Sequence, residues 1–223
     1  MMKKFNKILI IIAIILVFVG ATLLIFKQNK KDDNFKEESL INFNISNDIE
    51  HETSFISNNT YLVVVLKNNS NTNIIKANLK VNFTSEEINE EVNMLTKDNK
   101  TVVLVKVPDS LVSNILNEKI KITLDVIKEG NTNIIDISSL NKNIKYNPSL
   151  NNGYININID GNNTTSKDIK LLMGNIIMYK NNKIVEAKTF GIENIKSKSN
   201  FSKVVSLSNV NYDKIEVYYT FAY

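Results

Sequence analysis

The sequence predicts an all-β protein in which an N-terminal transmembrane helix is followed by two tandem immunoglobulin-like antiparallel β-sandwich domains. Three observations support this prediction. The apolar run Ile8–Phe26 contains no charged residue, and at about 1.5 Å of helical rise per residue it would span the roughly 30 Å hydrocarbon core of a bilayer. From Ser39 onward, short segments alternate between apolar and polar side chains, which is typical of half-buried strands. This second part also repeats its own pattern at an offset of about 93–96 residues.

The N-terminal segment is predicted to be a membrane anchor. Ile8–Phe26 is longer than the apolar region of a cleaved signal peptide, about 7–15 residues, and more apolar residues follow its only small-residue exit, Val19–Ala21. We therefore expect an uncleaved signal anchor, with a cleaved signal peptide as the alternative. Residues 1–7 would form a cytoplasmic tail and residues 27–38 a charged, solvated stalk. Lysines are equally numerous on both sides, so the shortness of the tail is what favours an extracytoplasmic C-terminal part.

The composition excludes several functions. The chain of 223 residues has 27 lysines, no arginine and 23 acidic residues. Residues 1–31 carry a net charge of +6 and the remainder carries −2, so the C-terminal part lacks the clustered basic face of a nucleic-acid-binding protein. The absence of cysteine excludes disulfides, thiolate zinc sites and a cysteine nucleophile. The abundance of Lys, Asn and Ile is typical of an AT-rich bacterial genome.

The first copy of the repeat begins with clear alternation. Ile41, Phe43 and Ile45 alternate with polar residues, which predicts a strand with one buried face. Four more strands are expected, at Tyr61–Lys67, Ile75–Phe83, Thr101–Val107 and Lys119–Ile127. The core side of the second of these should carry Ile75, Ala77, Leu79, Val81 and Phe83. The segment Pro108–Leu116 is expected to form one short capped helical turn.

One segment of the first copy has a mixed signal. Thr84–Leu95 starts like a helix, because a capping-box pattern precedes two apolar residues at helical spacing, Ile88 and Val92. Its counterpart in the second copy, Met178–Phe190, instead predicts two strands around the turn Asn181–Asn182. The repeat decides between the two, and we expect a β-hairpin in both copies.

Matched short motifs carry the repeat. Asn58–Tyr61 corresponds to Asn151–Tyr154, Ile41–Phe43 to Ile135–Ile137, and Glu118–Ile120 to Asp213–Ile215. We therefore predict two homologous domains, residues 39–128 and 131–223, joined at Glu129–Gly130. Each copy has six or seven short strands separated by turn residues, which is typical of an antiparallel sandwich of immunoglobulin-like size.

Two segments of the second copy resemble bacterial FxLYD-type domains. Ile157–Thr164 is similar to the strand and Asn-Ser/Thr turn that open such domains, and Met178–Tyr179 stand where the Leu-Tyr of the motif would be. Phe201 falls near the aromatic residue that commonly follows, whereas the first copy, at Val81–Phe83, matches only in outline. The sequence departs from the motif at Ile176 for the leading Phe, Lys180 for the Asp and Asn182 for the turn Gly. The resemblance implies an immunoglobulin-like envelope domain of no settled activity, and it transfers no catalytic residue.

Three groups of residues are candidates for chemical sites. His51 is the only histidine, which excludes multi-histidine metal sites, and we expect it to be a solvated loop residue. Asp160–Asp168 alternates oxygen-bearing side chains as calcium loops do, but Leu171 replaces the twelfth-position Glu and Lys167 opposes a cation. We therefore expect a hairpin turn there. The acidic residues Glu86, Glu87, Glu90 and Glu91 are expected at a solvated hairpin tip, with a weak contact to a cation or cationic polymer as the alternative.

A comparison of the two copies suggests an interaction surface. Ile155, Ile157 and Ile159 match Leu62, Val64 and Leu66, so these positions should face the core. The opposite face carries Asn156 and Asn158 in the second copy but Val63 and Val65 in the first. The second domain, the segment Phe55–Ile56 or a partner would cover the two valines; alternatively, valine simply suits a strand.

The terminal strand adds one further candidate. Its core face should carry Val217, Tyr219 and Phe221, so Tyr218 would point outward as an exposed contact residue. We expect no catalytic residue, cofactor or metal. The predicted function is a non-catalytic, membrane-anchored, extracytoplasmic interaction or scaffolding module of the bacterial cell envelope. It would contact the lipid bilayer through Ile8–Phe26 and bind a protein or cell-wall polymer. A solute- or carbohydrate-binding protein is the alternative.

Overall fold

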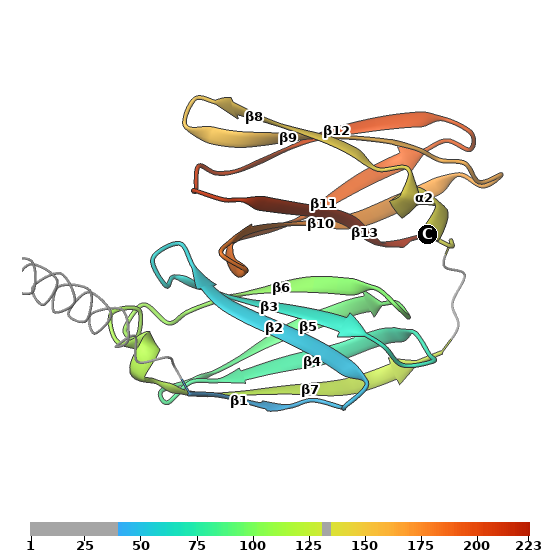
Figure 1. Cartoon of the computed structure of the whole chain (residues 1–223). Coiled ribbons are helices and arrows are strands. Elements are labelled where there is room, and N and C mark those ends of the chain that lie inside the picture. The colour runs from blue at the N-terminus through green and yellow to red at the C-terminus, as the bar shows by residue number, and fades with distance from the viewer. Residues whose placement is uncertain (1–39, 131–134) are drawn as a thin grey trace, which may run out of the picture. The chain divides into compact units, whose positions relative to one another are not determined.

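Two sets of strands make up the described part of the chain, residues 40–130 and 135–223 of a computed structural model (Figure 1). The expected anchor Ile8–Phe26 and stalk 27–38 lie outside the described residues. Within the described ranges, no helix is both long and apolar enough to cross a bilayer. The described chain is nearly all β, as the alternating sequence predicts.

The N-terminal half, residues 40–130, contains seven strands in two sheets. Its elements are β1 (Leu40–Asn44), β2 (Ile49–Ile56), β3 (Tyr61–Asn68), β4 (Ile74–Asn82), β5 (Glu87–Leu95), β6 (Lys100–Lys106), the 3-10 helix η1 (Ile115–Asn117) and β7 (Lys119–Glu129). One sheet has the order β1-β7-β4-β5 and the other the order β2-β3-β6. All pairs are antiparallel except β1 with β7, which is parallel.

The C-terminal half, residues 135–223, has one short helix and six strands. Its elements are α2 (Ser138–Lys142), β8 (Lys145–Asn151), β9 (Tyr154–Asn162), β10 (Ile169–Lys180), β11 (Lys183–Ile195), β12 (Asn200–Ser208) and β13 (Lys214–Ala222). The sheets have the orders β11-β10-β13 and β12-β9-β8. Strand by strand, these two orders correspond to β5-β4-β7 and β6-β3-β2 in the first half. The sequence repeat therefore corresponds to a repeat of topology.

Each half encloses its own apolar core between its two sheets. The first core includes the predicted inward residues of β3 together with alternate residues of β4, namely Leu62, Val64, Leu66, Ala77, Leu79 and Val81. The second includes Ile155, Ile157, Ile159, Ile176, Met178 and Tyr219. The period-2 alternation of the sequence therefore gives the inner faces correctly, because successive strand residues point to opposite sides of a sheet.

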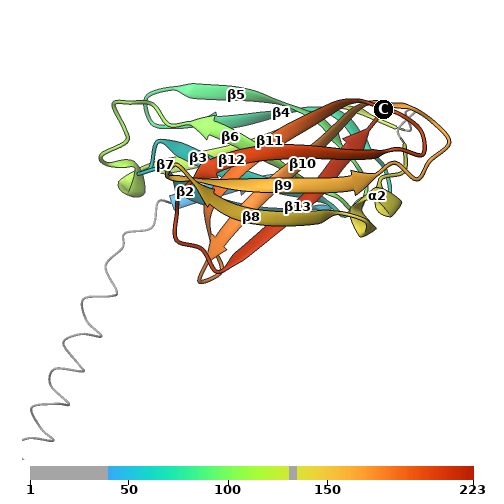
Figure 2. The ribbon, with the colours of Figure 1, turned by 90° about the horizontal axis from the view of Figure 1, so that it is seen from above.

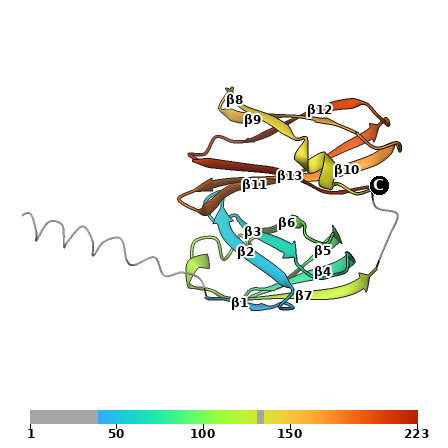
Figure 3. The same ribbon diagram turned by 45° about the vertical axis from the view of Figure 1, so that its right-hand side comes forward.

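Residues Ser39–Tyr223 form one compact unit, within which the four sheets lie face to face (Figure 3). The β2-β3-β6 sheet of the first half faces the β11-β10-β13 sheet of the second, and a third apolar cluster fills the space between them. The two remaining sheets form the outer layers. The described part of the chain is therefore a layered, sandwich-like assembly with two internal cores and one apolar seam.

Within the segment Thr84–Leu95, strand β5 (Glu87–Leu95) pairs with β4 in an antiparallel hairpin, as the repeat predicts, and residues 84–86 belong to the turn. Its counterpart β10–β11 turns at Asn181 and Asn182, whose φ angles are 50° and 60°. Two consecutive positive φ angles are what a two-residue hairpin turn requires, and asparagine tolerates them better than most residues. Hairpin geometry therefore overrides the helix-like spacing of the acidic segment.

Three predictions about strand alternation and turns are wrong, and two of these errors have one cause. The β4–β7 pairing is irregular between Ile74 and Ala77, so Ile74 rather than Ile75 is buried. The β10–β13 pairing likewise shifts by one residue at Thr220, which turns Ala222 rather than Phe221 into the core. An extra residue in one strand reverses the alternation beyond it.

The third error concerns Asp160–Asp168, which is not a hairpin turn. It connects β9 and β10, which belong to different sheets. The segment Pro108–Leu116 forms turns that lead into η1, and the residue before η1 makes no side-chain cap hydrogen bond. The helical turn predicted there is thus short, of the 3-10 type and uncapped by a side chain.

A buried asparagine at the equivalent position of each half holds the loop between the two sheets through hydrogen bonds. Asn68 donates from Nδ2 to the carbonyls of Thr72 (2.8 Å) and Leu95 (3.0 Å). Asn163 donates to the carbonyls of Lys167 (2.9 Å) and Lys196 (3.0 Å). Both Oδ1 atoms accept from the backbone N–H and hydroxyl two residues later, on Ser70 and on Thr165. The repeat therefore extends to the hydrogen bonds of a fully buried polar side chain.

Candidate functional site

The valines that the copy comparison singled out lie inside the protein. Val63 and Val65 are 0% and 4% exposed. They belong to the third apolar cluster, which we call the seam cluster; it consists of Ile56, Val63, Val65, Val102, Ile177, Tyr179, Ile184 and Ala187, with Leu104 and Tyr218 packed against it. The second half thus covers the valines, and Ile56 lies beside them.

The equivalent face of the second half is free and polar. Asn156 and Asn158 accept hydrogen bonds through Oδ1 from the hydroxyls of Ser206 (2.6 Å) and Ser202 (3.2 Å) on the neighbouring strand β12. Figure 2 looks onto this β12-β9-β8 sheet from above. The side chains of Asn156 and Asn158 are thus paired with their neighbours along the sheet.

Tyr218 does not form the exposed contact that we expected. Its ring packs on the seam cluster and its hydroxyl is buried without a hydrogen-bond partner among the described residues. The Nζ of Lys100 lies 5.4 Å from the centroid of the ring. Burial raises the pKa of the Tyr218 phenol above its ordinary value, with smaller contributions from Tyr179 and nearby carboxylates. The side chain points away from its own core, as predicted, but that side of β13 belongs to the seam.

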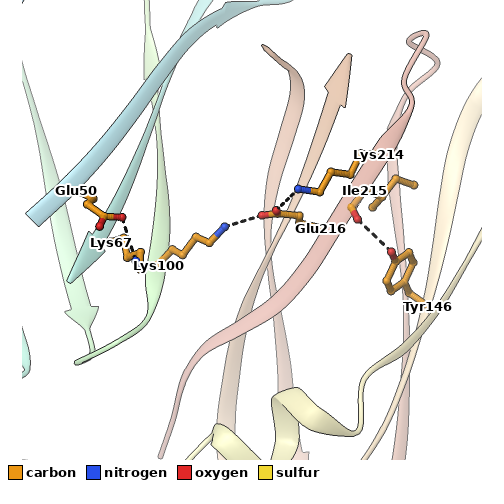
Figure 4. Close-up of polar contacts among 7 residues, drawn as sticks. All are labelled: Glu50, Lys67, Lys100, Tyr146, Lys214, Ile215 and Glu216. Carbon is orange, nitrogen blue, oxygen red and sulfur yellow. Dashed lines mark hydrogen bonds and ion pairs between the residues drawn. The ribbon is translucent and has the colours of Figure 1, made fainter. Parts of the chain in front are cut away.

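Three charged side chains lie together at one edge of the seam (Figure 4). Lys100 of β6 and Lys214 of β13 place their Nζ atoms 2.6 Å and 2.7 Å from the Glu216 carboxylate. Burial raises the pKa of Glu216, but the hydrogen bonds from the two lysines outweigh it, so the pKa lies below its usual value. Lys100 and Glu216 come from different halves, so their contact joins the two halves. We call this pair, together with Lys214, the seam ion pair.

Two further groups lie close to the seam ion pair. Burial raises the pKa of Glu52, and the charge of Lys100 opposes this shift. Burial and the charges of Glu216 and Glu52 raise the pKa of Tyr179, over whose ring Lys214 lies at 5.0 Å. No sequence motif marks this group, because its members come from four separate strands, β2, β6, β10 and β13.

Two hydrogen bonds also cross the seam. The Ser54 hydroxyl donates to the Ile184 carbonyl at 2.8 Å, and the buried Thr96 hydroxyl donates to the Thr220 carbonyl at 3.0 Å. Apolar packing, an ion pair and hydrogen bonds thus join the halves. Such a combination resembles the centre and rim of a protein–protein interface.

A pocket of about 790 Å³ opens at one end of the second half, and we call it the distal pocket. It is lined by the α2–β8 connection, the end of β9 and the start of β12, including Asn143, Lys145, Asp160, Asn200 and Phe201. The volume is in the range of small-molecule sites, and the lining offers amide and charged groups around one aromatic ring.

One residue that lines the distal pocket, Gly161, has no room for a side chain. A Cβ on Gly161 would lie 2.3 Å from the ring of Phe201 and 2.9 Å from the hydroxyl of Tyr219. The rings of Phe201 and Tyr219 are themselves 5.9 Å apart between centroids. The absent side chain therefore lets the rings of Phe201 and Tyr219 approach the backbone of Gly161, and Gly161 and Phe201 both line the pocket.

The remaining candidates do not belong to the seam ion pair. His51 lies on strand β2 rather than in a loop; it is exposed and its ring centroid is 3.7 Å from that of Phe43. Glu87, Glu90 and Glu91 lie along β5 and Glu86 lies in the turn before it, so the acidic residues do not form only a hairpin tip; Glu91 pairs with Lys76. In the β9–β10 connection, Asp168 accepts from the Lys196 Nζ at 2.9 Å and from the Ser197 N–H at 2.8 Å.

Neither a protein-family model nor a curated protein matches this chain.

Proposed function

We propose that the chain is a non-catalytic, membrane-anchored interaction or scaffolding module of the bacterial cell envelope. Its extracytoplasmic part would consist of two tandem immunoglobulin-like β-sandwich domains, residues 39–128 and 131–223, with residues 1–38 as tail, anchor and stalk. The likeness of the second copy to FxLYD-type domains supports the domain type. The bilayer contact through Ile8–Phe26 rests on the length and apolarity of that run.

The observation that carries this proposal is the distribution of apolar side chains over the sheet faces. The seam cluster occupies the faces that meet, so these faces are already covered and the outer sheets are left for a partner. On the free β12-β9-β8 face, Tyr154 and Val204 are 58% and 57% exposed among amide and hydroxyl side chains. We assign the partner-binding surface to this face, where exposed aromatic and aliphatic groups lie among hydrogen-bonding ones.

Cross-linking in intact cells tests the proposal. A photo-reactive amino acid in place of Val204 should capture an envelope protein or wall polymer. The same amino acid in place of Asn89, which is exposed on β5 at the opposite outer sheet, is the matched control. Equal products from the two positions would contradict the assigned surface. Alkaline extraction of membranes tests the anchor separately, because an integral chain stays with the bilayer.

The distal pocket favours a second candidate function, the binding of a solute or carbohydrate. Asn143 and Asn200 supply amide donors and acceptors, and Phe201 supplies an apolar ring, in a concave site of about 790 Å³. Glycan and metabolite arrays would reveal such a ligand. Binding should weaken on Asn200→Ala and remain unchanged on Asn89→Ala, which lies on another sheet.

A further inference from the structure

The distal pocket and the free β12-β9-β8 face meet along one row of residues. The strand register places Asp160 of β9 opposite both Lys145 of β8 and Ser202 of β12, so these three residues lie on the same side of the sheet. That side is the outer face, because the neighbouring Ile159 points into the core. All three residues also line the distal pocket. The pocket therefore opens at the end of the outer face that lies near α2 (Figure 2).

The outer face continues from this row along the length of β9. Its outward residues form three further rows, which are Asn147, Asn158 and Val204, then Ser149, Asn156 and Ser206, then Asn151, Tyr154 and Ser208. At about 3.4 Å per residue, the distance along β9 from Asp160 to Tyr154 is about 20 Å. We call the distal pocket and these four rows the extended site. It is one continuous surface, long enough for several units of a polymer.

Hydrogen bonds within the sheet fix the direction of polar groups in the extended site. The hydroxyls of Ser206 and Ser202 donate to Oδ1 of Asn156 and Asn158, so both hydroxyl oxygens remain acceptors for a ligand. The Nδ2 of Asn156 makes no hydrogen bond to another described residue, so it remains a donor. A partner rich in hydroxyl groups, each of which donates and accepts, pairs with these groups without reorganising them.

Each lysine of the extended site has an acidic residue close to it. Lys145 lies opposite Asp160 across the β8–β9 pair. Lys142 lies near Asp136, whose pKa is lowered by hydrogen bonds from Ser138 and, to a smaller extent, by the charge of Lys142. A phosphate-rich polymer or a nucleic acid would need unbalanced positive charge. Charge complementarity therefore favours a neutral partner.

The apolar groups of the extended site are few and lie apart. Phe201 lines the pocket, and Tyr154 is exposed at the far end of the face. Val204 is opposite Asn158, about 14 Å along the sheet from the row of Tyr154. A protein interface usually has one contiguous apolar and aromatic centre, which this arrangement lacks. Sugar rings instead present small apolar C–H faces, each of which packs on one separate aromatic ring.

We infer that the extended site binds a neutral, N-acetylated polysaccharide, with one end of the sugar chain in the distal pocket and the following units along the face towards Tyr154. The terminal sugar packs on Phe201, and a sugar several units away packs on Tyr154. The acetamido groups supply an amide N–H and C=O that match the asparagine side chains of the pocket and the face. This inference rests on the proposed function, since it names the partner of the surface assigned there.

Isothermal titration calorimetry of the full chain in lipid nanodiscs, with empty nanodiscs as the blank, tests the extended site. The probes are β-1,4-linked N-acetylglucosamine oligomers of one to six units. The affinity should rise at least tenfold from the dimer to the hexamer, because only the longer chain reaches Tyr154. Tyr154→Ala should therefore weaken the hexamer at least fivefold and leave the dimer unchanged.

Two further variants separate the pocket from the face. Asn200→Ala, in the pocket, should weaken the dimer and the hexamer alike, and Asn89→Ala, on the opposite outer sheet, should change neither. All three substituted positions are exposed, so each variant should keep the wild-type Tm, which a thermal melt checks. The inference is overturned if the hexamer does not bind, if it binds no more tightly than the dimer, or if Tyr154→Ala weakens both equally.

Failure of the proposed function would give a different result. Cross-linking in cells would then yield equal products at Val204 and Asn89, whatever the oligosaccharides do. Capture of a protein at Val204, together with no binding of the hexamer, would instead retain the interaction module and refute the polysaccharide.

Discussion

The β2-β3-β6 sheet of the first half and the β12-β9-β8 sheet of the second share topology and inner face but differ on the outer face. Inside, β3 and β9 both present large aliphatic residues to their cores. Outside, β3 presents Val63 and Val65 to the seam cluster, whereas β9 presents Asn156 and Asn158 to solvent and to the serines of β12. The inner-face residues are apolar because they form the core of their own half. The outer-face residues are apolar or polar according to whether another sheet covers them.

The other pair of equivalent sheets shows the same rule with the halves exchanged. The outer face of β4 and its neighbours carries ion pairs such as Lys80–Asp125, whose Nζ and Oδ2 are 2.6 Å apart. The outer face of the β11-β10-β13 sheet carries Ile177 and Tyr179, which belong to the seam cluster. Among the described sheets, apolar outer faces therefore occur where two sheets meet, and polar ones on the outer layers. Repeat assemblies need such polar ends for solubility.

The largest expected effect comes from making the first half's outer face resemble that of the second. Val63→Asn combined with Val65→Asn places two amides in an apolar seam and should lower the free energy of unfolding by about 4 kcal/mol. The reverse exchange, Asn156→Val with Asn158→Val, lies on a solvent-facing sheet and should change it by less than about 1 kcal/mol. Urea denaturation followed by circular dichroism measures both. Equal effects of the two exchanges would contradict the asymmetry.

The shared asparagines should instead behave alike. Asn68→Ala and Asn163→Ala each leave buried carbonyl groups without donors, so each should cost about 2 kcal/mol of unfolding free energy. Asn162→Ala, at an exposed neighbouring position, serves as the control and should be near neutral. A clear difference between the two buried variants would show that the loops are not energetically equivalent, despite their matched hydrogen bonds.

A smaller effect is expected for ion pairs at the two kinds of face. Lys100→Met leaves the Glu216 carboxylate partly buried with one lysine fewer and should cost about 1 kcal/mol. Lys80→Met breaks a more exposed pair with Asp125 on an outer sheet and should cost less than about 0.5 kcal/mol. Chemical denaturation at low ionic strength resolves the difference, and the reverse order would be inconsistent with a seam that excludes water.

The smallest effect is a pH dependence. The pKa of Glu216 is lower in the folded than in the unfolded protein, whose value is near 4.5, so its contribution is present above that pH and is lost as the pH falls through the folded pKa. Glu216→Gln should therefore reduce the acid-induced loss of stability by less than about 1 kcal/mol. The raised pKa of Glu52 acts in the opposite sense and is present in both proteins. Denaturation at pH 7 and at pH 3.5 measures the change, and identical pH slopes would argue against the Glu216 contribution.

Alternation predicted most strands and their inner faces, but it failed where a strand gained a residue. Ile75 and Phe221 were assigned to the cores and Ile74 and Ala222 occupy those places, because a bulge shifts the alternation without changing composition. The exposed role expected for Tyr218 failed for a different reason. Its direction away from its own core was right, but a second sheet lies on that side.

The order of apolar and polar residues was enough to determine that this chain is a β protein with two similar halves. Period-2 alternation and turn residues involve only neighbouring residues, so they can be identified in the sequence directly. The tertiary structure alone decided which outer faces meet, and so brought Lys100 to Glu216 and Ser54 to the Ile184 carbonyl. Those groupings depend on how distant strands pack against each other, and no spacing along the sequence encodes a distance between separate sheets.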